Sequence, residues 1–401
     1  MIFRRPPKHS RKWHHVTHIC LITGFIYQKK DTVNPHTNTH HAMASTKQAV
    51  FPPEVLARIT PEVSLERHLA LGLRPSLRQY DEFRTLSANP GSLTDLGTNS
   101  LVGLVTVRNG DTHVFCGITL GVTETNESDD FLSADTAANK NAAYATVYPV
   151  VEIARGRTGA PTDEEMILSQ QIHNHVLHLH VLPLLLLTLV PGYQLTNETT
   201  GESYVAYPDD LQMSADDLRS LSSTINITKK KYAYVLYAHI KVFSRVGPLF
   251  DVVHYALTAA LKNTVLPRVF LSDSGIDPNV RVPVRSRGNF GHLSQGSGRF
   301  CFDGNTTLAL PLQLYAARIG VSSLFGLVDL ETEQGTTSVL LADLEGEAEE
   351  ACAESRLTIV RNGDTLTHVS ITGGGANVTL ETFRRALQIA KSRAQVVTYG
   401  K

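Results

Sequence analysis

The stretch YAYVLYAHIKVFSRVGPLFDVVHYALTAALK, residues 232–262, predicts a buried strand that leads directly into a helix. Apolar residues occupy every second position in its first part, which is the period of a strand with one face in a core: Tyr234, Leu236, Ala238, Ile240 and Val242. After the Gly247-Pro248 turn, residues 251–262 are rich in Ala and Leu and predict a helix. This strand and helix are the centre from which the rest of the fold is predicted.

Two tight hairpins with the same turn sequence lie on either side of this centre. Residues 101–107 and 112–120 flank RNGD at 108–111, and residues 357–360 and 366–371 flank RNGD at 361–364. Asn-Gly favours a two-residue hairpin loop because both residue types tolerate positive φ angles. The shared RNGDT sequence suggests an internal duplication, although five matching residues also arise by chance. Strands grouped before a helix, twice over, predict a duplicated α+β unit.

Three further segments have helical patterns. Residues 163–180 place four apolar residues on one stripe: Leu168, Ile172, Val176 and Leu179. Residues 380–395 form the last helix, with five residues expected inward: Leu380, Phe383, Leu387, Ala390 and Ala394. Short helices broken at Pro61 follow Phe51, and a second cluster of strands is expected within residues 308–344.

The chain divides into a leader and two predicted halves. Residues 1–48 hold eight Lys or Arg against one acidic residue, and we expect a disordered tail or an extension upstream of Met43 rather than a mitochondrial presequence. Residues 49–270 form the N-terminal half, with a surface insertion at 191–231 that is rich in Asp, Ser and Thr. Residues 271–401 form the C-terminal half. We expect a chain that begins at Met43 to fold.

Composition excludes several classes of protein. The 401 residues include 37 Lys+Arg against 38 Asp+Glu, and 42% are hydrophobic, so the chain is neither disordered nor strongly basic. A net charge of −1 gives no overall attraction to nucleic acid. The four cysteines are too few and scattered for a disulfide framework and suggest reduced thiols inside a cell. No apolar run reaches the roughly 18 residues of a membrane helix, so we expect a soluble protein with no membrane partner.

Four histidines in one predicted helix invite a metal-site hypothesis. At 100° per residue, His173 and His180 lie on one flank of the apolar stripe, and His175 and His178 lie on the other. Only the i, i+3 pair His175/His178 could chelate a metal, and no HExxH motif is present. A solvated histidine-rich face is therefore the preferred interpretation, and a zinc site is the alternative.

The other candidate binding motifs are weak. Gly373-Gly374-Gly375 lacks the Lys-Ser/Thr of a P-loop and is interpreted as a strand-to-helix turn. Basic groups occur at Arg155 and Arg157, at 229–231, and at 281–287. Charge runs are usually solvated faces, but Arg155 and Arg157 are the residues we would choose as RNA contacts.

Several collinear stretches resemble the RNase PH-like ring subunits of the eukaryotic RNA exosome. The family's N-terminal segment contains Arg-Pro-Asp-Gly-Arg followed by Phe-Arg, and the corresponding positions here are RPSLR at 74–78 and Phe83-Arg84. YATVYPVVEIARGRTGAPTDEEM (144–166), YVLYAHIKVFSRVGPLFDVVHYALTAALKNTVLPR (234–268) and VLLADLEGEAEE (339–350) continue the match. The resemblance covers about residues 51–396.

The resemblance implies an α+β, RNase PH-like fold with two βαβα-type halves, of the ribosomal protein S5 domain 2-like kind. It implies other RNase PH-like exosome subunits as partners in a hetero-hexameric ring around an RNA channel, together with S1/KH-type cap subunits and associated exoribonucleases. It further implies a location in the nucleus, nucleolus and cytoplasm, and a role in rRNA maturation and mRNA turnover. We expect no cofactor.

The residues at the family's catalytic positions argue against activity. Phosphorolytic members resemble one another in an Asp-Gly-x-x-x-x-Asp strand whose carboxylates bind a divalent metal. Aligned on Gly326, those positions are Phe325 and Glu331, and the family's phosphate-binding Ser-Arg is replaced by Pro248-Leu249. We therefore expect a non-catalytic structural subunit with no catalytic residue and no metal ligand. The alternatives are an active phosphate-dependent 3′-5′ exoribonuclease and a His175/His178 metalloenzyme.

Overall fold

The strand predicted at residues 232–243 is the central strand of the larger sheet. In the computed structural model it is β10 (Lys231–Phe243), and the alternating residues from Tyr234 to Val242 are buried as expected. It pairs antiparallel with β3 (Thr112–Thr125) and parallel with β5 (Val147–Ile153). The predicted helix follows as α6 (Phe250–Lys262).

The structure describes the following residues: 51–91, 101–125, 144–156, 159–196, 201, 203–208, 231–272, 284–285, 299–332 and 335–399. The predicted leader 1–48, Arg157, and most of the predicted basic groups at 229–231 and 281–287 lie outside these residues.

Seven strands form this first sheet, in the order β1-β2-β3-β10-β5, with β13 beside β3 and β7 beside β10. The strands not yet introduced are β1 (Leu86–Pro90), β2 (Leu101–Asn109), β7 (Thr188–Leu189) and β13 (Val284–Arg285). Helix α6 packs on β2 and β3, and α4 (Asp163–Leu179) packs on β5. The first sheet, α4 and α6 are called the first half below.

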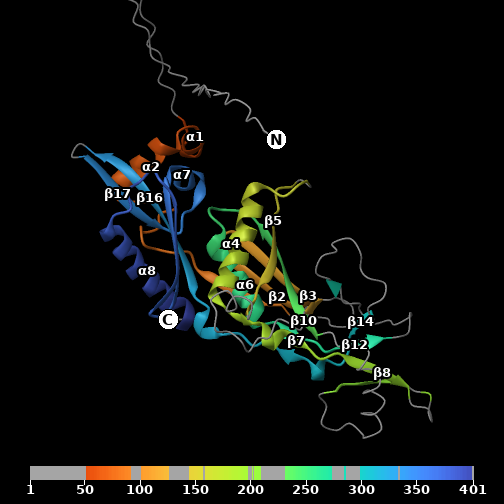
Figure 1. Ribbon diagram of the computed structural model, residues 1–401. Coiled ribbons are helices and arrows are strands. Elements are labelled where there is room, and N and C mark those ends of the chain that lie inside the picture. Colours follow the sequence, from red (N-terminus) through yellow and green to blue (C-terminus); the bar gives the residue numbers. More distant parts are fainter. Residues whose placement is uncertain are drawn as a thin grey trace, which may run out of the picture. The chain divides into compact units, whose positions relative to one another are not determined.

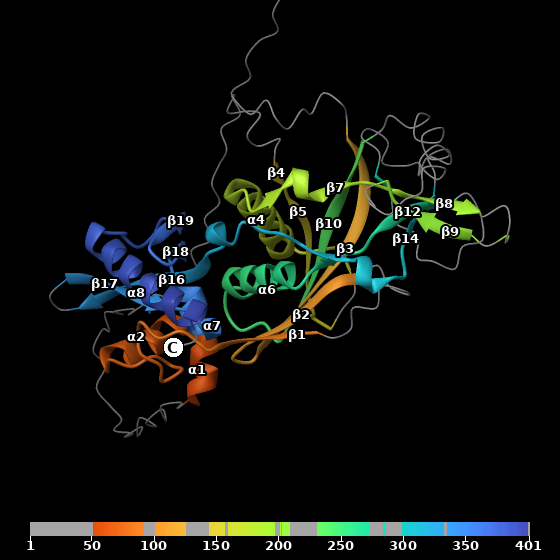
Figure 2. The same ribbon diagram turned by 90° about the horizontal axis from the view of Figure 1, so that it is seen from below.

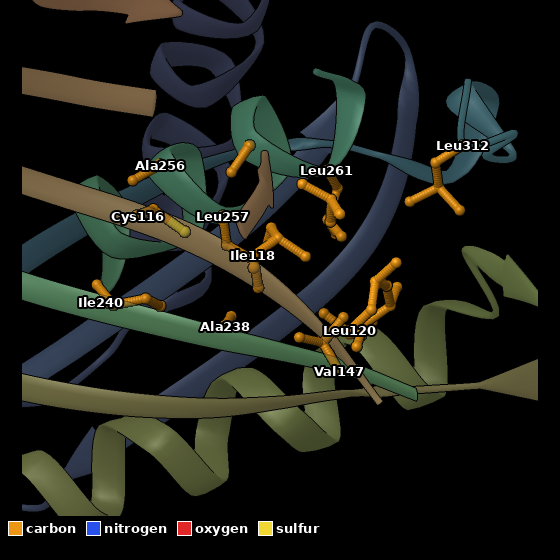
Figure 3. Close-up of a cluster of buried hydrophobic side chains, with 14 of the residues drawn as sticks. Cys116, Ile118, Leu120, Val147, Ala238, Ile240, Ala256, Leu257, Leu261 and Leu312 are labelled. Carbon is orange, nitrogen blue, oxygen red and sulfur yellow. The ribbon is translucent and has the colours of Figure 1, made fainter. Parts of the chain in front are cut away.

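The main core lies between the first sheet and α6. Figure 3 shows Cys116, Ile118 and Leu120 of β3 pointing toward Ala256, Leu257 and Leu261 of α6. Because these side chains alternate along the strand and recur along the helix, both elements bury one apolar face against the other. Phe300, Phe302 and Leu312 also belong to this core, although they lie after the domain boundary predicted at residue 270. That boundary stays a prediction.

A four-stranded sheet occupies part of the predicted insertion. Its order is β14-β12-β8-β9, formed by β8 (Gly192–Thr196), β9 (Ser203–Ala206), β12 (Val269–Ser272) and β14 (Arg299–Phe302). The first part of the segment 191–231 thus contains strands, and its interpretation as a surface insertion stays a prediction. Tyr193 and Ala206 pack on Leu271, and the Tyr207 hydroxyl donates to Asp303 Oδ2 at 2.7 Å, so this segment has a small core of its own.

Short elements connect these sheets. They are β4 (Tyr144–Ala145) with β6 (Leu182–Pro183), β11 (Val265–Leu266) with β15 (Leu310–Pro311), and the 3-10 turns at Leu184–Leu187, Thr306–Leu308 and Ala316–Arg318.

The second half is an antiparallel sheet of four strands in the order β17-β16-β18-β19. Its strands are β16 (Val321–Thr332), β17 (Gly335–Ala342), β18 (Ser355–Asn362) and β19 (Thr365–Gly373). Helix α8 (Leu380–Tyr399) packs on β16 and β18. Helices α2 (Pro61–Ala70) and α7 (Gly346–Cys352) pack on each other, and α2 covers the opposite face of β16. Helix α1 (Pro53–Ile59) precedes α2, so the predicted break at Pro61 is confirmed.

One inward residue predicted for the last helix is wrong. Leu380 is 64% exposed because it is the first residue of α8, whereas Ala386, Ala390 and Ala394 are buried against the sheet. Figures 1 and 2 show α4 and α6 between the first sheet and the second sheet. The two halves therefore meet through these helices, and α6 contacts β16 directly.

Both hairpins predicted from RNGD are present, but the turn differs in detail. Asn109 pairs with Thr112, and Asn362 pairs with Thr365, so each loop consists of the Gly and Asp between them. Gly110 and Gly363 have φ angles of 59° and 54°, whereas the asparagines are strand residues without positive φ. A glycine in the first loop position is typical of a type II′ turn, in which only that residue needs positive φ.

Two stretches that carry the family resemblance meet through arginines. Arg74 is fully buried and contacts Glu349 of α7, and it also donates to the carbonyls of Ala342 and Asp343. Arg84 holds the Asp343 carboxylate, with Nη2 at 2.7 Å from Oδ1 and Nε at 2.8 Å from Oδ2. This pairing keeps the pKa of Asp343 below its usual range although burial opposes it. The N-terminal segment is thereby fixed to the second half.

No helix in the described part of the chain has the length and apolar character needed to cross a membrane.

Candidate functional site

A cleft of about 610 Å³ lies between the two halves. One wall comes from α4 and the start of α6, and the other comes from β16, β18 and β19. Its volume is within the range of small-molecule sites, and its position between two halves is where such sites commonly occur.

The first turn of α4 is fixed by a capping box at the edge of the cleft. Glu165 Oε2 accepts a hydrogen bond from the Thr162 backbone N–H at 2.5 Å, and its Oε1 accepts one from Ile153 N–H at 2.7 Å. These backbone hydrogen bonds, that of Thr162 first, lower the pKa of Glu165. The neighbouring residue Glu164 therefore lies at a defined place in the cleft wall.

Arg245 joins the walls of the cleft. Its Nη1 and Nη2 lie 2.9 and 2.6 Å from the two carboxylate oxygens of Glu350, and its Nε lies 2.8 Å from Glu164 Oε1. These hydrogen bonds, chiefly to Glu350, raise the pKa of Arg245, so it stays charged. Arg356 lies on the far side of Glu350, with Nη2 3.7 Å from Oε1. Each carboxylate in this network faces a guanidinium, and the charges of the cleft largely cancel.

The predicted RNA contact Arg155 lies at the border of this network. Its Nη2 is 2.9 Å from Glu164 Oε2, and its side chain is about one third exposed. Arg157 is not among the described residues. The structure therefore places one of the two predicted residues near the cleft, where it is paired with a carboxylate. Its contact with RNA stays a prediction.

The residue that the sequence resemblance aligns with the family's first catalytic position belongs to the core. Phe325 is fully buried, packs with the residues under α8, and meets Phe83 edge to face with ring centroids 5.6 Å apart. Its strand neighbour Leu324, and not Phe325, lines the cleft. Glu331 lies six residues further along β16, opposite Thr336. Because Phe325 has no metal-binding atom, β16 does not present a pair of carboxylates at these two positions.

The start of α6 also lacks a phosphate-binding group. Pro248 and Leu249 line the cleft, and Leu249 is the N-cap residue, with no side-chain hydrogen bond to the helix. A helix N-terminus can bind an anion through its free N–H groups, but Pro248 and Leu249 directly before it provide neither a hydroxyl nor a guanidinium, and the nearby Arg245 is paired with Glu164 and Glu350.

The histidines of α4 do not form the solvated face that the sequence suggests. His178 is exposed, but His175 is buried, and its ring lies 4.7 Å from that of His254 in α6 and 5.0 Å from that of His368 in β19. Helical geometry places His175 beside the apolar stripe of α4, and β19 of the second half covers that side of the helix. The expectation of solvation is wrong for His175 because β19 packs against it.

Burial keeps these imidazoles neutral. Desolvation first, and the neighbouring histidines second, lower the pKa of His175 to about 2 and that of His254 to about 4. The pKa of His368 is also lowered, chiefly by burial. Within the described ranges, no group of three or more His, Cys, Asp or Glu has the arrangement to hold a metal ion. The three rings meet edge to face and are packed as apolar groups.

Sequence reasoning missed His368 and Arg245 as residues of this cleft, and it missed His254 as the buried partner of the His175 ring. His254 lies within a regular apolar helix, His368 within a hairpin strand, and Arg245 in a turn, so none belongs to a motif. The sequence signal for this cluster was the group of four histidines at 173–180, and that group indicates neither the partners of the histidines nor their burial.

Comparisons with known proteins agree with the fold. Residues 82–267 match the model of the 3′ exoribonuclease family, domain 1, the RNase PH domain. The exosome complex component rrp43 of Schizosaccharomyces pombe is 25% identical over 230 residues, which are 56% of this chain and 65% of that protein. The matched part thus spans just under two thirds of that relative's length.

Two solved structures resemble the chain along most of their length. The Archaeoglobus fulgidus exosome with RNA bound to the active site has a TM-score of 0.49 and 16% identity, and the match covers 86% of this chain and 99% of that chain. An archaeal exosome core has a TM-score of 0.47 and 15% identity, with 86% and 98% covered. The family match and the observed elements confirm the α+β, RNase PH-like fold predicted from the sequence. The resemblance to exosome RNase PH-like subunits, and among them to the ribosomal RNA-processing protein 43 type, is likewise confirmed.

Proposed function

We propose that this RNase PH-like chain is a non-catalytic structural subunit of the RNA exosome core ring, which supports 3′-5′ RNA processing and degradation. The observation that carries the proposal is the burial of Phe325 where phosphorolytic members have a metal-binding carboxylate. A side chain in the core under α8 neither binds a metal ion nor transfers a proton. The Pro248-Leu249 start of α6 and the paired charges around Arg245 support the same conclusion.

The proposed partners are other RNase PH-like subunits in a hetero-hexameric ring, S1/KH-type cap subunits and associated exoribonucleases, with RNA in the channel. The printed name of the S. pombe relative, an exosome complex component, supports this assignment. The proposed location is the nucleus, nucleolus and cytoplasm.

Activity is tested on the full chain, purified without partners. We expect no release of nucleoside diphosphates from single-stranded RNA in the presence of phosphate and Mg²⁺, and no hydrolysis without phosphate. Glu331→Gln provides the control for a contaminating nuclease, because trace contamination persists in that variant. Phosphate-dependent product release that is lost in Glu331→Gln would show that the chain is an active exoribonuclease.

Assembly is tested separately in cells. Affinity purification of the full chain followed by mass spectrometry should recover the other RNase PH-like subunits in comparable amounts. Depletion of the chain should disperse those subunits and cause 3′-extended rRNA precursors to accumulate. If the remaining subunits still co-purify and rRNA processing is normal after depletion, the structural role is wrong.

A further inference from the structure

Two arginines of the cleft face the same carboxylate. Nη1 and Nη2 of Arg245 lie 2.9 and 2.6 Å from the two oxygens of Glu350, and Nη2 of Arg356 lies 3.7 Å from Oε1 of that carboxylate. All three residues line the cleft. The planar fork of a guanidinium binds a carboxylate and a phosphate group in the same bidentate manner. The position of the Glu350 carboxylate therefore suits a tetrahedral oxyanion.

The groups beside Arg356 are also of a kind that binds an oxyanion. Thr358 lies on the same face of β18, and Ser370 and Thr372 are paired with Thr358 and Arg356 on β19. All of them line the cleft, and a hydroxyl can donate a hydrogen bond to an anionic oxygen. Among the cleft-lining residues of β18 and β19, a guanidinium and three hydroxyls thus occur without an acidic side chain.

The charge balance of the cleft depends on Glu350. Among the described residues of the lining, Glu164 and Glu350 are the acidic ones, and Arg245 contacts both. Arg155 at the border also pairs with Glu164. Three guanidinium groups therefore face two carboxylates, and they would face one if Glu350 carried no charge. Because a cleft with excess positive charge attracts anions, this single carboxylate decides whether the cleft takes one.

We propose that Glu350 determines the specificity of the cleft, because its carboxylate occupies an oxyanion position between Arg245 and Arg356 and thereby excludes inorganic phosphate. The inference deepens the proposed function and rests on it, since it names the residue that keeps out the anion on which phosphorolysis depends. Binding is measured without RNA and without turnover, so the two can fail separately. A folded Glu350→Gln protein that binds no phosphate, while the unmodified chain is inactive, would overturn this inference alone.

Phosphate binding is measured by calorimetry on the full chain, in a chloride buffer of low ionic strength because salt screens partly exposed charges. The unmodified chain should show no binding at about 10 mM phosphate, whereas Glu350→Gln should bind phosphate with a Kd of about 1 mM or lower, a gain of at least tenfold. Sulfate should compete with phosphate in this variant, since the guanidinium fork recognises the shape and charge of the anion.

The matched control is Glu347→Gln on the same helix α7. The Glu347 side chain is 75% exposed and pairs with Arg58, and neither residue lines the cleft. This variant removes the same charge and should bind no more phosphate than the unmodified chain does. Adding Arg245→Met to Glu350→Gln should abolish the binding that Glu350→Gln gains, because the bidentate fork is then absent.

Glu164→Gln provides a second test should Glu350→Gln unfold. It releases Nε of Arg245 and Nη2 of Arg155 at a side chain that is about one third exposed, and it should also gain phosphate binding. The proposal is wrong if folded Glu350→Gln, or Glu164→Gln in its place, binds phosphate less than about tenfold tighter than the unmodified chain. It is also wrong if Glu347→Gln gains the same binding, or if the gained binding persists without Arg245.

Discussion

Arg74 and Glu349 are 275 positions apart in the sequence and form a fully buried ion pair, in which Nε and Nη2 of Arg74 lie 2.9 and 2.5 Å from Oε1 and Oε2 of Glu349. The pair joins the segment before the first sheet to α7. Glu349 Oε2 also accepts the backbone N–H of Glu345, and Arg74 donates to three backbone carbonyls, so the charges are surrounded by further hydrogen bonds.

Replacing Arg74 with Met should destabilise the chain by about 3–5 kcal/mol, because it leaves the Glu349 carboxylate buried without its cation. Equilibrium unfolding in urea measures the loss. The control is Arg58→Met, which removes the exposed ion pair between α1 and Glu347 of the same helix α7. That change should cost less than about 1 kcal/mol. Equal effects of the two variants would contradict a structural role for the buried pair.

Gly247 lies where the turn before α6 meets the second half. Its φ angle is 85°, and a Cβ there would collide with the backbone carbonyl oxygen of Leu344. We expect Gly247→Ala to lower the unfolding free energy by more than the roughly 1–2 kcal/mol of a left-handed alanine, since backbone must move. Gly346, with a φ of 81° and no atom near the position of a Cβ, isolates the conformational cost alone. The structure is contradicted if Gly346→Ala is as harmful as Gly247→Ala.

Phe325 should tolerate apolar replacement but not the family's carboxylate. Phe325→Asp places a charge in the core beside Phe83 and should destabilise the chain by several kcal/mol, with no gain of RNA phosphorolysis. Phe325→Leu keeps an apolar side chain and should cost about 1–2 kcal/mol. Urea unfolding of both variants, with an activity assay on the folded fraction, measures the difference. A stable and active Phe325→Asp protein would show that this position faces the cleft.

The histidine cluster should make stability depend on pH. The folded pKa values of His175 and His254, about 2 and about 4, lie below the unfolded value of 6.5, so the unfolded state binds protons first as the pH falls. Their contribution to stability is complete above pH 6.5 and is lost progressively below it, by about 1.4 kcal/mol per pH unit for each group. His254 of α6, His368 of β19 and His178 of α4 lie around His175. Their charges repel a proton on its ring, which lowers the pKa of His175 in addition to the effect of burial.

At about pH 4.5, His175→Phe should therefore retain about 2–3 kcal/mol more of its neutral-pH stability than the unmodified chain does. The free energy of unfolding is measured between pH 7 and 4.5, with the exposed His239→Phe as the control. If His175→Phe and the unmodified chain lose equal amounts of unfolding free energy between pH 7 and 4.5, the placement of His175 as a buried imidazole is contradicted.

Local patterns in the sequence were sufficient to predict the longer helices and several of the longest strands. Alternation over residues 234–242 gave β10, the stripe from Leu168 to Val176 gave α4, and both RNGD turns gave hairpins. These predictions succeed because a strand repeats every two residues and a helix every 3.6, whatever packs against them. The sequence also shows a phenylalanine at position 325, and a phenylalanine cannot bind a metal wherever it lies.

Residue patterns alone were thus enough for the α+β class, the longer elements and the absence of a carboxylate at position 325. Three contacts became known only from the folded chain: Arg74 is buried with Glu349, Phe325 faces α8, and His175 lies against His254 and His368. Each of these contacts joins segments far apart in the chain. The free energy of a charged or polar side chain depends on the partners that burial brings to it, and no local pattern specifies those partners.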